Sequence, residues 1–141
     1  MSQGSSRRDF VKAATVAGVG FWVAGGVSAK ESTAAIEEVN LACVGVGGKG
    51  RSDSSDAARS GNIVAICDID DKTIKAAQAN PKMTGAKVYN DYRKMIDEVG
   101  KDIDAITVST PDHNHAPAAI RAMREGIHAF TQKPMTHSLD V

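Results

Sequence analysis

This chain has few aromatic residues, few cysteines and no excess of either charge. Aromatic side chains form 4% of the 141 residues, there are two cysteines, and 17 basic residues balance 17 acidic ones. The even charge balance excludes the basic surface that binds nucleic acid or anionic lipid. Two cysteines that match no zinc-binding spacing argue against a metal site. We expect one domain with a core made mainly of Val, Ile and Ala.

A glycine-rich turn directly follows the apolar run 39–44, which we interpret as a strand. The turn reads Gly45-Val46-Gly47-Gly48-Lys49-Gly50 and leads into a helix. Gly45 permits a tight turn, Gly47 lets the backbone approach a phosphate, and Gly50 lets the helix pack closely on the strand. The amide groups at the start of that helix then face the phosphates. This strand, turn and helix predict a dinucleotide site.

An acidic residue follows at the expected distance. The apolar run 62–67 is typical of a second strand, and it ends at Asp68, 18 positions after Gly50. A carboxylate there accepts hydrogen bonds from the adenosine ribose, which favours NAD and repels the extra phosphate of NADP. NADP stays open as the alternative cofactor, because Lys49, Arg51 and Lys72 can offset that repulsion.

The first 29 residues have the pattern of an export signal. Ser6-Arg7-Arg8-Asp9-Phe10-Val11-Lys12 is a twin-arginine pattern, an uncharged stretch spans 13–29, and Val27-Ser28-Ala29 is a small-residue cleavage signal. A membrane anchor is the competing interpretation, but the stretch is shorter than the roughly 20 residues usually needed. We expect recognition by the twin-arginine machinery, export to the periplasm, and a short lead-in at 30–38 before the nucleotide domain at 39–141.

Cys43 and Cys67 each fall near the end of an expected strand. A disulfide is conceivable in an exported protein, but twin-arginine export carries proteins that have folded around reduced thiols. We therefore expect two buried free thiols that pack as small apolar side chains.

Strands and helices alternate along the rest of the chain. The patterns predict strands over 39–44, 62–67, 86–89, 104–109 and 127–131, with helices after the glycine turn and over 70–80, 90–99 and 115–125. Such alternation favours a parallel sheet with right-handed crossovers, and thus an α/β, Rossmann-type, doubly wound fold.

Polar segments leave the fourth and fifth strands at the edge where such sheets bind ligands. They are Ser109-Thr110-Pro111-Asp112-His113-Asn114-His115 and Gln132-Lys133-Pro134. We expect both to border the nicotinamide half of the cofactor. Asp112 and His113 are equally explained as helix-capping and solvated residues. Without a third spaced ligand, the two histidines do not predict a metal.

The glycine turn, the Thr-Pro-Asp-His-Asn-His segment and the Lys-Pro pair together resemble the Gfo/Idh/MocA oxidoreductases, and the leader resembles their exported, glucose–fructose oxidoreductase-like members. The resemblance covers residues 39–141. It assigns the pyrophosphate turn to Gly45, Gly47 and Gly50, with backbone groups from Val46, Gly48 and Lys49. It assigns the ribose contact to Asp68 and the cofactor lining to Thr110, Pro111, Asn114 and His115.

The same resemblance implies that Lys133 lies between the cofactor and a substrate hydroxyl, where it can relay the departing proton during hydride transfer. The resemblance also implies a cis peptide bond between Lys133 and Pro134. Gln132 departs from the family pattern, which commonly has glutamate, although an amide can still bind a ribose hydroxyl.

The family architecture continues into a second α/β domain that holds the substrate pocket and the oligomer interface. This chain stops at Val141, inside what resembles the next helix. We therefore expect a C-terminally truncated fragment with an incomplete sheet, in which homo-oligomers form only at full length.

Three functions remain open at this point. The first is the nucleotide-binding part of an exported NAD(P)-dependent oxidoreductase that acts on a sugar, cyclitol or related hydroxyl compound. The second is a cofactor-binding module that is catalytically incompetent alone. The third is part of an NAD-dependent glycosidase of the same superfamily. Fold analogy does not separate them.

Overall fold

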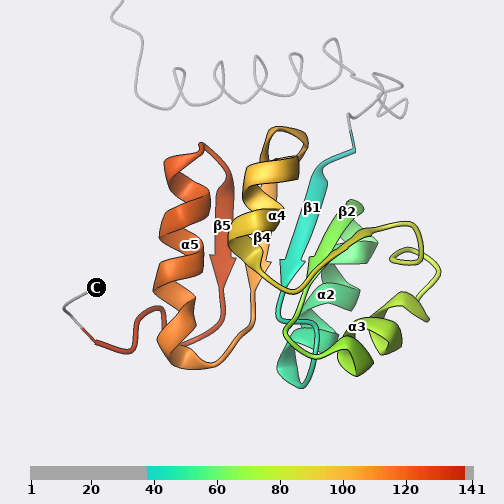
Figure 1. Ribbon diagram of the computed structural model, residues 1–141, viewed down its shortest axis with the longest axis horizontal. Coiled ribbons are helices and arrows are strands. Elements are labelled where there is room, and N and C mark those ends of the chain that lie inside the picture. Colours follow the sequence, from blue (N-terminus) through green and yellow to red (C-terminus); the bar gives the residue numbers. More distant parts are fainter. Residues whose placement is uncertain (1–37, 139–141) are drawn as a thin grey trace, which may run out of the picture. The chain divides into compact units, whose positions relative to one another are not determined.

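The computed structural model describes residues 38–138, so the expected export signal lies outside the described residues. Figure 1 shows a sheet with helices on both faces. Its elements in chain order are β1 (Asn40–Val44), α2 (Lys49–Ser60), β2 (Asn62–Cys67), α3 (Asp71–Gln78), β3 (Lys87–Tyr89), α4 (Tyr92–Val99), the 3₁₀ turn η1 (Gly100–Asp102), β4 (Ala105–Val108), the 3₁₀ turn η2 (Asp112–Asn114), α5 (His115–Arg124) and β5 (His128–Thr131).

The five strands form one parallel sheet in the order β3-β2-β1-β4-β5. The chain therefore starts at the centre, moves outward to β3 and then crosses to the other side. This confirms the predicted Rossmann-type α/β fold. Because all strands run the same way, their carboxyl ends meet at one edge, toward which the arrowheads of β1, β4 and β5 point in Figure 1. The switch in strand order between β1 and β4 opens a crevice at that edge.

Each face of the sheet carries its own apolar cluster. One cluster joins the sheet to α4 and α5, and the other joins it to α2 and α3. Small and branched side chains dominate both, as the scarcity of aromatic residues predicts. Cys43 lies in the cluster under α2, and Cys67 lies in the opposite one, so the strand pleat separates them. Both are buried free thiols, as predicted, and burial raises the pKa of Cys67 to about 12.

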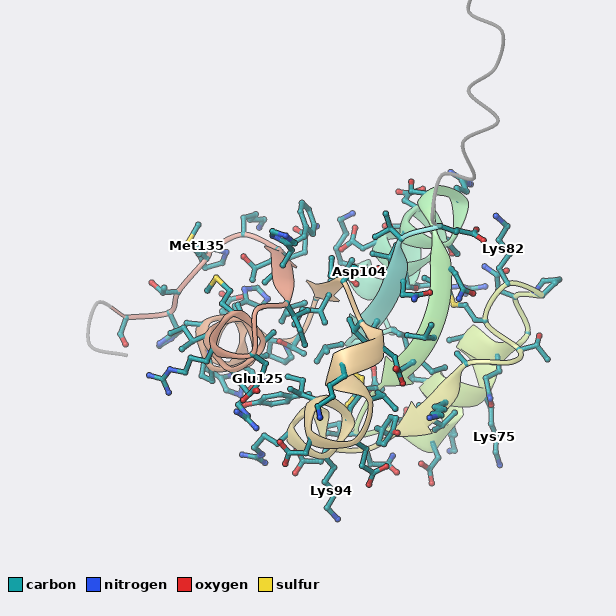
Figure 2. The ribbon with its side chains drawn as sticks, turned by 90° about the horizontal axis from the view of Figure 1, so that it is seen from above. Lys75, Lys82, Lys94, Asp104, Glu125 and Met135 are labelled. Atoms are coloured by element: carbon teal, nitrogen blue, oxygen red, sulfur yellow. The ribbon has the colours of Figure 1, made fainter. Side chains whose placement is uncertain are left out.

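Side-chain caps set the helix starts more sharply than the sequence pattern does. Asp70 accepts a hydrogen bond from the amide of Lys72 and starts α3, and Asp91 accepts one from the amide of Arg93 and starts α4. Helix α4 thus begins two residues later than predicted. Charged side chains on the outer surface, such as Lys75 and Lys94, extend away from the sheet in Figure 2. No helix within residues 38–138 is long and apolar enough to span a membrane.

We expect Met95→Ala to lower the free energy of unfolding by about 2–5 kcal/mol, because it leaves a cavity beneath α4. Met95 is fully buried, whereas Met123 on α5 is 54% exposed, so Met123→Ala serves as the matched control. Thermal unfolding followed by circular dichroism measures both. Equal melting temperatures for the two variants would contradict the packing described here.

Candidate functional site

A cavity of about 590 Å³ opens at the carboxyl edge of the sheet. It lies where nucleotides bind in open parallel sheets, and its size is in the ordinary range for a ligand site. The glycine turn, the end of β2, the start of α4 and the segment after β4 surround it. The lining residues are Val44, Gly45, Gly47, Cys67, Asp68, Ile69, Thr73, Asn90, Asp91, Tyr92, Arg93, Ser109, Thr110, Pro111, His113 and Asn114.

The glycine turn brings α2 unusually close to the end of β1. Gly45 has a φ of +80°, which favours glycine, and a Cβ atom there would lie 2.7 Å from the carbonyl oxygen of Ser109. A Cβ atom on Gly50 would lie 2.0 Å from the carbonyl oxygen of Gly45. No side chain fits at either position without moving backbone. The structure therefore supports the predicted reasons for the first and last glycines.

The start of α2 is free to face an anion. Its N-cap is Gly48, which offers no side-chain cap, and the first turn carries no acidic residue. The first amide groups of a helix need acceptors, and the positive end of the helix dipole favours a negative charge. The ammonium group of Lys49 instead turns along the helix to the carboxylate of Asp53, 2.5 Å away.

Asp68 lies at the end of β2 and lines the cavity, as its predicted role requires. One carboxylate oxygen accepts a hydrogen bond from the amide of Val46 at 3.0 Å, and the other accepts one from the amide of Asp70 at 3.1 Å. Each carboxylate oxygen retains a further lone pair that can accept a ribose hydroxyl. The side chain of Val46 packs in the core beneath α2. This residue therefore anchors the turn with its side chain while its backbone amide binds Asp68.

The segment after β4 divides between the cavity and the interior. Thr110, Pro111 and Asn114 line the cavity, as predicted, and so does His113. His115 lies outside that lining and is only 1% exposed. Its two ring nitrogens lie 2.6 Å and 2.7 Å from the carbonyl oxygens of Pro134 and Thr110. The ring thus joins the segment after β4 to the one after β5.

The segment after β5 holds the remaining predicted residues. Lys133 is exposed and follows Gln132, and the peptide bond between Lys133 and Pro134 is cis, as the resemblance implies. Neither Gln132 nor Lys133 belongs to the cavity lining. The side-chain amide of Gln132 instead donates a hydrogen bond to Asp53 at 3.0 Å.

Asp53 and Ser109 also belong to the site, although the sequence did not lead us to assign either of them a role in it. The hydroxyl group of Ser109 donates to the Asp53 carboxylate at 2.7 Å. Burial alone would raise the pKa of Asp53, but hydrogen bonds from Lys49, Ser109 and Gln132 and the charge of Lys49 hold that pKa below its ordinary value. Asp53 stands three residues after Gly50, on the face that α2 turns to the sheet, and that spacing is the signal that could have identified it.

These features together fit a dinucleotide. The turn excludes side chains where backbone must come close, the helix start lacks its own cap, and a carboxylate with spare lone pairs lies at the end of β2. The donors and acceptors therefore match a pyrophosphate and a ribose diol.

Comparison with known proteins places the chain in a family. A family model described as "Oxidoreductase family, NAD-binding Rossmann fold", that of the Gfo/Idh/MocA proteins, matches residues 39–141. The chain belongs to this family, whose characteristic domain binds NAD.

Relatives within the family carry more than one activity in their names. A Glycosyl hydrolase family 109 protein of Solibacter usitatus is 30% identical over 152 aligned residues, which cover 96% of this chain and 34% of the relative. An inositol 2-dehydrogenase of Salmonella typhimurium is 32% identical over 73 residues, which cover 52% of this chain and 21% of the relative. The chain thus spans about a third, or less, of the length of these relatives.

Solved structures show the same arrangement. The myo-inositol dehydrogenase of Lactobacillus casei, solved with NAD(H) and myo-inositol, superposes with a TM-score of 0.65 at 27% identity, over 73% of this chain and 30% of the enzyme. The WlbA dehydrogenase of Bordetella pertussis, solved with NADH and UDP-GlcNAcA, superposes with a TM-score of 0.59 at 25% identity, over 70% of this chain and 30% of the enzyme.

We expect Gly50→Ala to raise the Kd for NADH about fivefold or more, because the added methyl group pushes α2 away from the turn; such overpacking costs about 1–3 kcal/mol. Gly85→Ala is the matched control, since a Cβ atom there meets open space at an ordinary backbone conformation. Titration of each variant with NADH, followed by fluorescence, compares them. Tight binding by the Gly50 variant would show that the close approach is unnecessary.

Proposed function

We propose that this chain is the nucleotide-binding part of an NAD(P)-dependent oxidoreductase that acts on a sugar, a cyclitol or a related hydroxyl compound. The observation that carries the proposal is the glycine turn, which leads into the uncapped start of α2 and lines one cavity together with Asp68. NAD is the expected cofactor, with NADP as the alternative. The bound nicotinamide would supply hydride acceptance and donation.

Lys133 is the residue of this chain that we assign to proton transfer. It follows β5 at the same edge of the sheet as the cavity, and its side chain is exposed and therefore accessible to a substrate. An ammonium or amine group there can hold or relay the proton of a substrate hydroxyl group while hydride leaves the adjoining carbon. Thr110, Pro111 and Asn114 would line the nicotinamide side, and the backbone of the glycine turn would bind the pyrophosphate.

NAD-dependent glycoside cleavage is the second candidate, and the extent of the alignments favours it. The alignment with the Solibacter protein covers 96% of this chain and so includes most of residues 1–37, whereas that with the Salmonella dehydrogenase covers 52%. The product pattern separates the two chemistries in a protein that joins this chain to a substrate-binding domain. Net reduction of NAD by a sugar or cyclitol indicates a dehydrogenase, and glycoside cleavage without net NAD reduction indicates a glycosidase.

We also propose that residues 1–29 are a twin-arginine signal, that 30–38 are a lead-in, and that 39–141 are a truncated Rossmann domain of a longer, periplasmic protein. The twin arginines Arg7 and Arg8 and the small-residue cleavage pattern at 27–29 support export. The short share of each relative that the chain spans supports truncation. By itself the chain would then be a cofactor-binding module, and homo-oligomers would require the longer protein.

We expect Asp68→Ala to raise the Kd for NADH about tenfold or more, because hydrogen bonds to a charged group contribute about 1.5–3 kcal/mol. Asp68→Asn keeps an acceptor for the amide of Val46 but removes the charge, so it should bring the affinities for NADPH and NADH closer together. Asp102→Asn, an exposed change in η1, controls for net charge. Calorimetric titration with both nucleotides measures these Kd values. An unchanged preference for NADH over NADPH in both Asp68 variants would contradict the assignment of Asp68 to the ribose contact.

We expect Lys133→Met to lower kcat by about 10²–10⁴-fold in a protein that includes the substrate domain, because general acid–base catalysis contributes that much. The Kd for NADH should change far less. Lys101→Met, at the exposed turn η1, is the matched loss of a lysine. Equal kcat values for the two variants would remove Lys133 from the mechanism.

A further inference from the structure

Three segments far apart in the sequence meet at the carboxylate of Asp53. It receives hydrogen bonds from Lys49 Nζ at 2.5 Å, from Ser109 Oγ at 2.7 Å and from Gln132 Nε2 at 3.0 Å. The first donor lies on α2, the second at the end of β4 and the third at the end of β5. The Asp53 side chain is 9% exposed, so its carboxylate is largely shielded from water, whereas the Lys49 side chain is 63% exposed.

The partners fix the orientation of the Gln132 amide. A carboxylate only accepts hydrogen bonds, so the NH₂ group of Gln132 must face Asp53. The amide oxygen, Oε1, then lies 3.4 Å from the backbone nitrogen of Lys133. The Gln132 side chain is thus turned to α2, and it holds the backbone that leads directly into Lys133.

This geometry requires a donor at position 132. A glutamate there, which is common in the family that the chain resembles, would place a second carboxylate about 3 Å from Asp53. Two carboxylates at such a distance cannot both ionise readily. Among the described residues, Lys49 on α2 is the cation that pairs with Asp53, and Ser109 after β4 offers only a neutral donor. The thiol of Cys43 on β1 is close enough to feel the charge of Asp53.

We propose that Asp53 is a positioning residue that couples the cofactor-binding helix α2 to the Lys133 loop through Gln132, and that it dictates an amide at position 132. Asp53 thereby fixes the position of α2 relative to the residue that precedes Lys133. The consequence for cofactor binding rests on the proposed function, whereas the pairing of Asp53 with Gln132 does not.

A donor–acceptor exchange tests the proposal. The variants of the full chain are Gln132→Glu, the double variant Asp53→Asn/Gln132→Glu, and the control Asp56→Asn. In the double variant the amide and the carboxylate change places, so the hydrogen bond and the total charge of the cluster are retained. Asp56 lies on the same helix and pairs only with the exposed Arg59 among the described residues. NADH titration and thermal unfolding are measured for each at about pH 5 and about pH 8.

We expect Gln132→Glu to raise the Kd for NADH about tenfold at the higher pH, and less at the lower pH, where the two carboxyl groups share a proton. Sharing raises the folded-state pKa of the pair, so the stability of this variant should fall as pH rises through that pKa. The double variant should recover an NADH Kd within about threefold of the original at both pH values. A Gln132 side chain that merely filled space, without pairing with Asp53, would show neither the pH profile nor the rescue.

Several results would overturn the proposal. One is a Gln132→Glu variant that binds NADH normally at both pH values. Another is a double variant whose NADH binding is as weak as that of Gln132→Glu alone. Should Gln132→Glu fail to fold at the higher pH, recovery of folding and binding in the double variant still supports the pairing, and failure of both refutes it. If the original chain binds no NADH, the proposed function fails, while the unfolding temperatures of the variants still decide the pairing.

Discussion

The contact between Gly50 and the carbonyl group of Gly45 is the constraint on which the rest of the site depends. At 2.0 Å from that oxygen a Cβ atom has no room, so only glycine lets α2 begin directly against the end of β1. That approach places Asp53 within hydrogen-bond reach of the ends of β4 and β5. Cofactor binding and the arrangement of the Lys133 loop therefore share one steric origin.

Buried polar groups, more than apolar ones, connect the loops at this edge. The apolar clusters hold the helices to the sheet, and each lies on one face of it. The ring of His115 bridges the carbonyl groups of Thr110 and Pro134, and Asp53 bridges Ser109 and Gln132. Since a buried polar group is costly without its partner, each bridge favours one relative placement of the two loops. Two such bridges between the same loops make that placement specific.

The sequence predicted the order of strands and helices well, because apolar periodicity and capping residues are local signals. All five predicted strands form, and the glycine turn and Asp68 lie at one cavity edge. It did not predict the partners of Gln132 and His115. Gln132 meets Asp53 across 79 positions, and His115 meets Pro134 across 19, so no local pattern encodes either contact. A polar residue beside a motif suggests a contact with a ligand. Only the fold shows that its hydrogen-bonding group already has a partner within the protein.

Under the proposed function, cofactor binding and catalysis make different demands on this edge of the sheet. Pyrophosphate and ribose need groups that the fold already fixes, namely the turn, the start of α2 and Asp68. Hydride transfer also needs a site from which water is largely excluded, since that strengthens the electrostatic interactions with the reacting groups. Lys133 is exposed, and beside it Phe130 and Met135 expose 58% and 73% of their surface; Figure 2 shows Met135 on the segment that leaves β5. If Lys133 acts as proposed, the apolar side chains of Phe130 and Met135 would suit contact with a covering surface, and nucleotide affinity and catalytic competence would be separable properties.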